Sequence, residues 1–565
     1  MSIMKRGSYR FGIILLSLYA VVFVLLSRLF YLQIYNHEFF KSKSEDQLKR
    51  IIRLYPHRGN IYDRNMVPMA LTEPCYSAYA MPAQIEGKWA FSAQFARLTN
   101  GSKRSVYKKI NNKYPFVWLK RKLTSFEYRA LKELSLKGLD FIKEEKRVFP
   151  HQNLASSILG FVGIDNQGLG GLEYQFDHYL RGNEGKIILE GDPRGKRLVT
   201  GVRKTVESVY NGGNIVTTID NYLQYIAERE LKKGIIKQEA SGGQVVIMNP
   251  QNGDILALVD YPYFNPNNWS AYPYSNLRNS CVTDVFEPGS VLKIITVSAV
   301  LEEGLFEPET VLKVPEKLVI AGCTIKEAHK RDPNDTDRKS VADIIIESLN
   351  VGSTLLAEQL GAERLYKYYK DFGFGQVTNI DLPGESCGLL RPLSQWSGVD
   401  YAMLSFGQGI AATPLQIACA IGAIANKGLR VQPRIIRQMT DYQSTTLRAV
   451  PFKSQGRVVS RKTAEKVIKI MVDVVEKGTA EGVKVPGLAI AGKTGTAQKP
   501  RKDGRGYEKD KYIASFVGFF PADNPKYLIL VMVDSPQKKI YGSSVAGPVF
   551  KGITDAVIHY DPSLF

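Results

Sequence analysis

An uncharged apolar run near the N-terminus limits what this chain of 565 residues can fold into. The run Phe11–Ser27, FGIILLSLYAVVFVLLS, carries no charge and continues beyond Arg28 as LFYLQI. A helix rises about 1.5 Å per residue, so the run nearly crosses the roughly 30 Å hydrocarbon core of a bilayer, and the Arg28 side chain can extend it by reaching the headgroups. The sequence therefore predicts a transmembrane helix over residues 11–33.

A cleaved signal peptide is the alternative for the same segment. The run is longer than the apolar region of most signal peptides, and the following YNHEFFKSKSED has no small-x-small cleavage site. Lys5, Arg6 and Arg10 precede the run, so the positive-inside rule predicts a cytoplasmic tail over residues 1–10 and an exported remainder. We therefore expect a single-pass anchor.

The formal net charge of +20 predicts attraction to an anionic partner such as a nucleic acid, lipid headgroups or an acidic cell-wall polymer. The basic residues are dispersed and no zinc-finger or aromatic RNA-binding pattern occurs, so we expect no nucleic acid partner. The six histidines never stand four apart or beside a cysteine pair, which predicts no metal site. We also expect no cofactor. The five cysteines are odd in number and widely spaced, so we expect small buried residues rather than a disulfide scaffold.

The part of the chain after the predicted anchor changes in texture near residue 225. Between about residues 66 and 210, short apolar runs alternate with basic loops and no catalytic pattern appears. Their turn YPHRGNIYDRN carries Arg58, Asp63 and Arg64, for which a local salt-bridge network is a better interpretation than a functional role.

Residues 225–565 predict an α+β domain. The segments Gln244–Pro262 and Tyr512–Pro536 each contain two apolar runs around a turn rich in Pro, Asn or Gly, which is typical of a β-hairpin. Most of the sequence between them has the helical period. We expect an antiparallel sheet covered by helical layers.

The stretch FEPGSVLK, residues 286–293, places Ser290 three residues before Lys293. If a helix begins at or near Ser290, both side chains lie on one face. A lysine that is partly removed from water loses its proton more easily, and its neutral amine can then accept the serine proton. The pattern alone is weak, because Ser-x-x-Lys also occurs at Ser2, Ser105 and Ser535.

Two further patterns follow in order. Ser348-Leu349-Asn350 offers a hydroxyl and an amide that can relay a proton and hold a substrate, although a polar turn between two helices is an equal interpretation. Lys493-Thr494-Gly495-Thr496 contains the only Lys-Thr-Gly of the chain. Its hydroxyls suit a terminal carboxylate, and Gly495 lets an extended peptide approach the backbone.

The order Ser-x-x-Lys, Ser-x-Asn, Lys-Thr-Gly matches the penicillin-binding and serine β-lactamase pattern. With RGNIYDRN, VTDVFEPGSVLK, LSFGQGIAATPLQ, AGKTGTAQK and ASFVGFFPADNP, the chain resembles the class B penicillin-binding proteins, and most of all their cell-division (FtsI-like) branch, from the anchor to the C-terminus. It departs from the pattern at Leu349, where β-lactamases have Asp, and at Asn279-Ser280-Cys281, where Arg-Ala is common before Val-Thr-Asp.

The resemblance implies an elongated, dimerisation-like pedestal domain over residues 34–224 and a transpeptidase domain over residues 225–565. It implies that Ser290 attacks a D-alanine carbonyl of a peptidoglycan stem peptide. It also implies roles for the other motif residues: Lys293 as general base, Ser348 and Lys493 in passing the proton to the leaving amine, Asn350 in orienting the acyl chain, Thr494, Gly495 and Thr496 in binding substrate, and the backbone N–H groups of Ser290 and Thr496 as oxyanion hole. Penicillins are expected to acylate Ser290.

The resemblance also implies a place in the cell and a set of partners. We expect the inner membrane, a periplasmic catalytic domain, a membrane glycosyltransferase of the shape, elongation and division family (FtsW-like) and other division proteins. A class A β-lactamase needs an added carboxylate that no motif here supplies, so cross-linking is favoured over β-lactam hydrolysis. An elongation-type class B transpeptidase and a non-catalytic penicillin-binding scaffold or sensor remain as alternatives.

Overall fold

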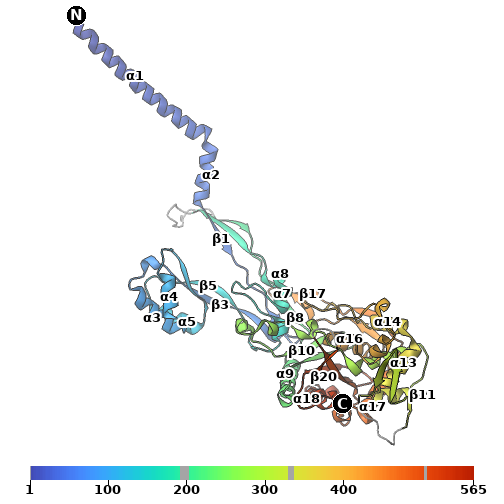
Figure 1. Cartoon of the computed structure of the whole chain (residues 1–565). Helices are drawn as coiled ribbons and strands as arrows, with labels where there is room; N and C mark the ends of the chain where they lie inside the picture. The colour runs from blue at the N-terminus through green and yellow to red at the C-terminus, as the bar shows by residue number, and fades with distance from the viewer. Residues whose placement is uncertain (1, 191–202, 329–335, 502–505, 565) are drawn as a thin grey trace. The chain divides into compact units, whose positions relative to one another are not determined.

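The computed structural model describes residues 2–190, 203–328, 336–501 and 506–564, and these divide into two compact units (Figure 1). The first unit comprises residues 1–57 and 182–211. In it, α1 (Ser2–Phe30) leads through a π-helical turn, Tyr31–Tyr35, into α2 (His37–Leu48). The strands β1 (Lys49–Leu54), β6 (Gly185–Glu190) and β7 (Arg203–Glu207) form an antiparallel sheet in the order β1-β6-β7.

The apolar part of α1 and the turn that follows it support the predicted anchor. Residues Phe11–Tyr35 form an apolar helical stretch of 25 residues, and its most apolar window is wholly unburied. Such a row of exposed Leu, Ile, Val and Phe side chains is unfavourable in water and favourable in lipid. The helix therefore suggests membrane anchoring, as expected from the sequence.

The second unit comprises residues 58–181 and 212–565. Within its described residues, one sheet has the strand order β17-β16-β8-β2-β3-β4, and β5 also pairs with β3. The strands are β2 (Ile61–Tyr62), β3 (Pro68–Ala80), β4 (Val117–Leu123), β5 (Leu139–Val148), β8 (Asn214–Thr217), β16 (Ile436–Thr440) and β17 (Thr446–Ala449). The parallel pair β2–β8 joins the segment before residue 181 to the segment after residue 212.

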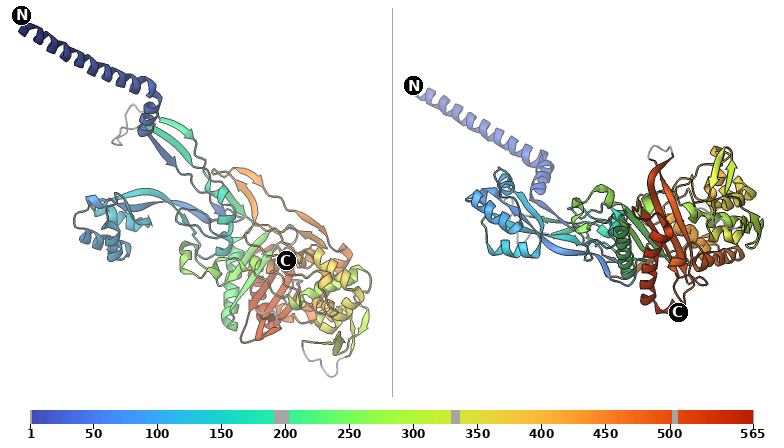
Figure 2. Two further views of the ribbon diagram at one scale, coloured as in Figure 1. Left: turned by 45° about the horizontal axis from the view of Figure 1, so that its top comes forward. Right: turned by 60° about the horizontal axis from the view of Figure 1, so that its bottom comes forward.

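Three helices pack on β3, β4 and β5 around a core of their own (Figure 2). They are α3 (Lys88–Thr99), α4 (Lys103–Ile110) and α5 (Ser125–Glu133). Phe95, Ile110 and Leu131 are almost fully buried in this core. The α5 helix begins with a reciprocal cap between Thr124 and Glu127, which satisfies free N–H groups of its first turn.

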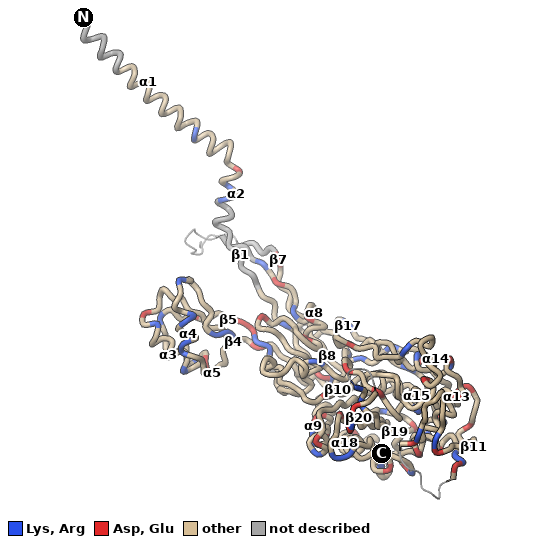
Figure 3. Tube along the Cα trace, viewed as in Figure 1, with Lys and Arg blue, Asp and Glu red and all other residues tan. Residues whose placement is uncertain are grey.

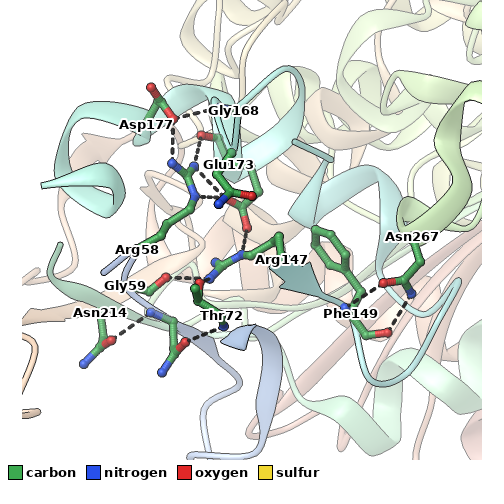
Figure 4. Close-up of polar contacts among 12 residues, drawn as sticks. Arg58, Gly59, Thr72, Arg147, Phe149, Gly168, Glu173, Asp177, Asn214 and Asn267 are labelled. Atoms are coloured by element: carbon green, nitrogen blue, oxygen red, sulfur yellow. Dashed lines mark hydrogen bonds and ion pairs between the residues drawn. The ribbon is translucent and has the colours of Figure 1, made fainter. Parts of the chain in front are cut away.

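The short helices α6 (Ser156–Leu159), α7 (Gly171–Gln175) and α8 (Asp177–Arg181) follow β5, and a buried ion cluster holds the turn before β2 to α7 and α8 (Figure 4). Arg58 donates to Glu173 Oε2 from Nη2 at 2.6 Å and to Asp177 Oδ1 from Nη1 at 2.7 Å. Arg147 donates to the other oxygen of Glu173 at 2.6 Å and to the Gly59 carbonyl at 2.7 Å. An ion pair is thereby confirmed for Arg58, although its partners are distant in sequence rather than local, whereas Asp63 accepts from the backbone N–H groups of Asn65 and Val67.

The other sheet of the second unit is antiparallel, with the order β10-β9-β21-β20-β19 over the described residues. Its strands are β9 (Gly242–Met248), β10 (Ile255–Tyr261), β19 (Ala491–Pro500), β20 (Tyr507–Phe520) and β21 (Tyr527–Asp534). The pairs β9–β10 and β20–β21 are the two predicted hairpins. In this sheet β19, which carries the Lys-Thr-Gly motif, is an edge strand.

Helices cover this sheet as expected for an α+β domain. The helices α9 (Asn221–Gln238) and α18 (Gly542–Tyr560) pack on each other and on the sheet, and α16 (Pro414–Ala425) and α17 (Arg461–Lys477) form a second pair on it. Figure 1 shows the sheet between these two pairs. Further helices pack beyond α17: α11 (Lys293–Glu302), α12 (Val341–Ile346), α13 (Asn350–Leu360) and α14 (Ala362–Asp371).

The positions of the charged residues and of the cysteines can be compared with what the composition predicts. Lys and Arg are spread along the described trace rather than gathered in one arm (Figure 3). All five cysteines are free. Cys75, Cys281 and Cys419 are buried, as expected, whereas Cys323 and Cys387 are exposed, so the expectation of burial is wrong for these two.

Candidate active site

The Ser-x-x-Lys segment forms the turn from which α11 begins. Gly289–Leu292 is a 3₁₀ turn, and α11 follows directly from Lys293. Residues three apart eclipse one another in a 3₁₀ turn, so Ser290 and Lys293 lie on one side, as the sequence predicts. Ser290 is half-buried, and Lys293 is completely buried.

The Lys293 amine is held by the Ser-x-Asn motif. Its Nζ donates to the Ser348 carbonyl at 2.6 Å and to Asn350 Oδ1 at 2.8 Å, and the Ser348 hydroxyl lies at 3.4 Å. Burial lowers the pKa of Lys293 to about 7, against the opposing negative charge of Glu327. A substantial fraction of this amine is therefore neutral near neutral pH.

A second buried lysine meets the same serine from the edge strand. Lys493 Nζ donates to Ser348 Oγ at 2.8 Å, and its side chain is completely buried. Burial, followed by the nearby positive charge of Lys293, lowers the pKa of Lys493 well below its usual value. Ser348 thus bridges the two amines, and its φ of +60° places it in the left-handed region between α12 and α13.

Two glycines bring the Ser290 turn against β19. A Cβ on Gly495 would lie 2.3 Å from Ser515 Oγ, 2.9 Å from Val291 Cγ2 and 3.1 Å from the Pro288 carbonyl. Gly289 has a φ of +58°, and a Cβ there would lie 3.1 Å from the Thr496 carbonyl. The absence of side chains at both positions is what lets the turn and the strand touch.

The loop containing FGQG, residues 406–409, contacts the Ser290 turn. Gly289 N–H donates to the Gly407 carbonyl at 3.1 Å, and a Cβ on Gly407 would lie 2.1 Å from the Gly289 carbonyl. Glu287 accepts from the Gly409 N–H at 2.9 Å and from the Tyr507 hydroxyl at 3.0 Å. Glu287 therefore connects the turn to this loop and to β20.

Two threonines of β19 each make a side-chain hydrogen bond. Thr496 Oγ1 accepts from the Gly542 N–H at the start of α18 at 3.0 Å, so its hydroxyl proton remains available to an incoming acceptor. Thr494 Oγ1 and Thr479 Oγ1 are 3.1 Å apart.

The structure therefore brings the three motifs together, with Lys293, Ser348, Asn350 and Lys493 in one hydrogen-bonded cluster. Sequence reasoning missed Glu287, Glu327 and Thr479. Glu287 stands inside the FEPGSVLK stretch and could have been weighed there, whereas nothing in the local sequence marks Glu327 or Thr479. Over the described residues, no three His, Cys, Asp or Glu side chains gather in a way that could hold a metal ion.

Comparison with known proteins identifies two family domains. Residues 243–555 match the penicillin binding protein transpeptidase domain, and residues 53–217 match the penicillin-binding protein dimerisation domain. The transpeptidase match alone spans more than half of the chain and contains all three motifs.

Individual relatives agree with this assignment over almost the whole chain. The chain is 35% identical over 543 residues to stage V sporulation protein D of Bacillus subtilis, which covers 94% of this chain and 83% of that protein. It is 30% identical over 562 residues to peptidoglycan D,D-transpeptidase FtsI of Escherichia coli K12. This match covers 98% of this chain and 92% of FtsI. A crystal structure of penicillin binding protein 3 from Mycobacterium tuberculosis, complexed with aztreonam, has a TM-score of 0.71 and 28% identity, covering 90% of this chain and 97% of that one. The chain belongs to the class B penicillin-binding proteins.

Proposed function

We propose that this protein is a serine D,D-transpeptidase that cross-links peptidoglycan stem peptides during septum formation. Family membership supports the class of reaction, and the cluster around Lys293 supports the assignment of individual residues. The domain limits expected from the sequence, 34–224 for the pedestal and 225–565 for the transpeptidase domain, form part of this proposal.

The observation that carries the chemistry is the hydrogen bonding of the Lys293 amine. A neutral amine has two N–H groups and one lone pair. The Ser348 carbonyl and Asn350 Oδ1 are short-range acceptors for the two N–H groups, at 2.6 and 2.8 Å. The lone pair is then left for the hydroxyl proton of Ser290, one turn earlier, which makes Lys293 the general base.

Acylation follows from this arrangement. Lys293 takes the Ser290 proton as Ser290 Oγ bonds to the carbonyl carbon of the penultimate D-alanine. The peptide C–N bond then breaks, and the terminal D-alanine leaves after its nitrogen receives a proton through Ser348 and Lys493. The N–H groups of Ser290 and Thr496 stabilise the oxyanion, a contribution typically worth about 3 kcal/mol per donor.

Transfer completes the reaction. An amine from a neighbouring stem peptide attacks the acyl carbon and gives up a proton, which returns to Ser290 Oγ through Lys293 as the ester bond to Ser290 breaks and a cross-link forms. Asn350 orients the acyl chain, Thr494 and Thr496 hold the terminal carboxylate, and Gly495 lets the extended peptide lie along the β19 edge. A β-lactam enters the same path when its ring amide opens on Ser290.

Covalent labelling tests the nucleophile. Full-length protein in detergent is expected to bind a fluorescent penicillin covalently, and Ser290→Ala is expected to abolish the label because it removes the hydroxyl oxygen that would bond to the β-lactam carbonyl carbon. Ser105→Ala is the matched control, since Ser105 shares the Ser-x-x-Lys spacing with Lys108 but is exposed on α4. Label that persists on Ser290→Ala would refute the assignment.

The cellular role needs its own test, because the relatives include both a sporulation protein and FtsI. The septal role, with an FtsW-like glycosyltransferase and other division proteins as partners at the inner membrane, rests on the resemblance of the motifs to the cell-division branch. Depletion is then expected to produce filaments. Round cells would favour an elongation enzyme, and full growth on Ser290→Ala would favour a non-catalytic scaffold.

A further inference from the structure

An acidic residue outside all three motifs contacts the Ser-x-Asn segment. Glu327 follows β13 (Cys323–Lys326), which pairs with β12 (Lys317–Ile320) in a short hairpin. The Glu327 carboxylate accepts from the backbone N–H of Asn350 at 2.5 Å and of Val351 at 3.1 Å. These are the first two residues of α13, so Glu327 caps this helix at the end where free N–H groups and the positive end of the helix dipole favour an anion.

The same hairpin fixes the Asn350 amide. Asn350 Nδ2 donates to the Lys326 carbonyl at 3.0 Å. With its nitrogen bound there, the amide must present Oδ1 to the other side, where it lies 2.8 Å from Lys293 Nζ. Asn350 is thus held through its backbone by Glu327 and through its side chain by Lys326.

We propose that Glu327 is a positioning residue for acylation: it caps α13 so that Asn350 faces Lys293, and its negative charge sets the pH range in which the site reacts. This proposal rests on the role of Lys293 as general base in the proposed function. Glu327 acts through Asn350 and Lys293 and does not touch the substrate.

The charges around Lys293 give the direction of the pH effect. The charged groups that face Lys293 are Glu327 beyond β13 and Lys493 on β19, and its neutral neighbours are Ser348 and Asn350. The Glu327 charge raises the Lys293 pKa against the larger lowering by burial. Without that charge the pKa falls further, so the amine becomes neutral, and able to act as a base, at lower pH.

The pH profile of acylation tests this inference. In full-length wild-type protein, the second-order rate constant for a fluorescent penicillin is expected to rise about tenfold between pH 5 and 6 and to level off above 7, because it follows the neutral form of Lys293. For Glu327→Gln, the rising limb is expected to move to lower pH by roughly one unit, the lower end for a single neighbouring charge. The plateau is expected to fall severalfold because the cap is weakened.

Two further variants separate the effect of the Glu327 charge from the effect of its helix cap. Glu316→Gln removes the same charge from an exposed residue just ahead of β12 and is expected to leave limb and plateau unchanged. Glu327→Asp keeps the charge on a shorter side chain, so the limb is expected to stay near pH 7 while the plateau falls.

Each contrary outcome is informative. An unmoved limb in Glu327→Gln would overturn the electrostatic role, even with a lower plateau. If Glu327→Gln does not fold, an unchanged plateau in Glu327→Asp would overturn the positioning role. Absence of acylation in wild-type protein would instead overturn the proposed function itself.

Discussion

At the scale of single residues, the site depends on side chains that are absent as much as on those present. Gly289, Gly407 and Gly495 each stand where a Cβ would press into a neighbouring segment. Gly495 is the clearest case, because the segment that it faces carries Ser290.

Gly495→Ala is therefore expected to damage reactivity more than folding. The added Cβ must push away Ser515 Oγ, Val291 and the Pro288 carbonyl, which moves the Ser290 turn away from β19. A misplacement of about 1 Å can reduce a rate on the order of a hundredfold, so we expect penicillin acylation to fall by at least tenfold. The rate of covalent labelling measures this.

Gly482→Ala serves as the control, because a Cβ at that position meets nothing within 4 Å. It is expected to react at the wild-type rate. Equal rates for Gly495→Ala and Gly482→Ala would contradict the close-approach argument.

The motif residues could be predicted from the sequence, whereas the contacts and the backbone conformation that hold them in place could not. Ser290 and Lys293 are three apart, so helical geometry alone predicts their common side. Glu327 and Asn350 meet only because a hairpin folds back onto the start of α13, and no local periodicity encodes that meeting. The left-handed conformation of Ser348 is also invisible in sequence, because a non-glycine residue there depends on the surrounding structure.

At the scale of elements, the buried ion cluster fastens the Arg58 turn and β5 to α7. Glu173 is completely buried and binds both Arg58 and Arg147, which are themselves buried. Removing a partner from a buried ion pair leaves an uncompensated charge, which costs far more than losing an exposed pair.

Glu173→Gln is expected to reduce the free energy of unfolding by about 3–5 kcal/mol, because two buried guanidinium groups lose their shared carboxylate. Glu86→Gln breaks the exposed pair with Lys137 and is expected to cost less than about 1 kcal/mol. Chemical denaturation of the two variants measures the difference. Equal stability of the two would show that the cluster does not fasten these elements.

The hairpins of the catalytic sheet were predictable because both strands and their turn lie within one short segment. The seven-stranded sheet was not, since β2 is only two residues long and pairs both with β3, which follows it directly, and with β8, which lies far along the chain. Pairing between distant segments depends on tertiary packing rather than on local pattern.

At the scale of the whole molecule, the apolar helix belongs to the first unit, whereas all five cysteines lie in the second unit. The exposed Cys323 and Cys387 can therefore report on which side of the membrane the second unit lies.

A membrane-impermeant maleimide is expected to label the protein in intact spheroplasts, because the proposed topology places the second unit outside the cytoplasmic membrane. The double substitution Cys323→Ser, Cys387→Ser is expected to lose the label, since Cys75, Cys281 and Cys419 are buried. Label that appears only after lysis would contradict the proposed orientation.

The backbone contacts of Gly289, Gly407 and Gly495 also bear on how a bacterium can escape β-lactam antibiotics. In the proposed mechanism, a larger residue at these positions would separate Ser290 from β19, so reaction with the drug and with the natural peptide would be lost together. Resistance is therefore not expected to arise by substitution at these three positions.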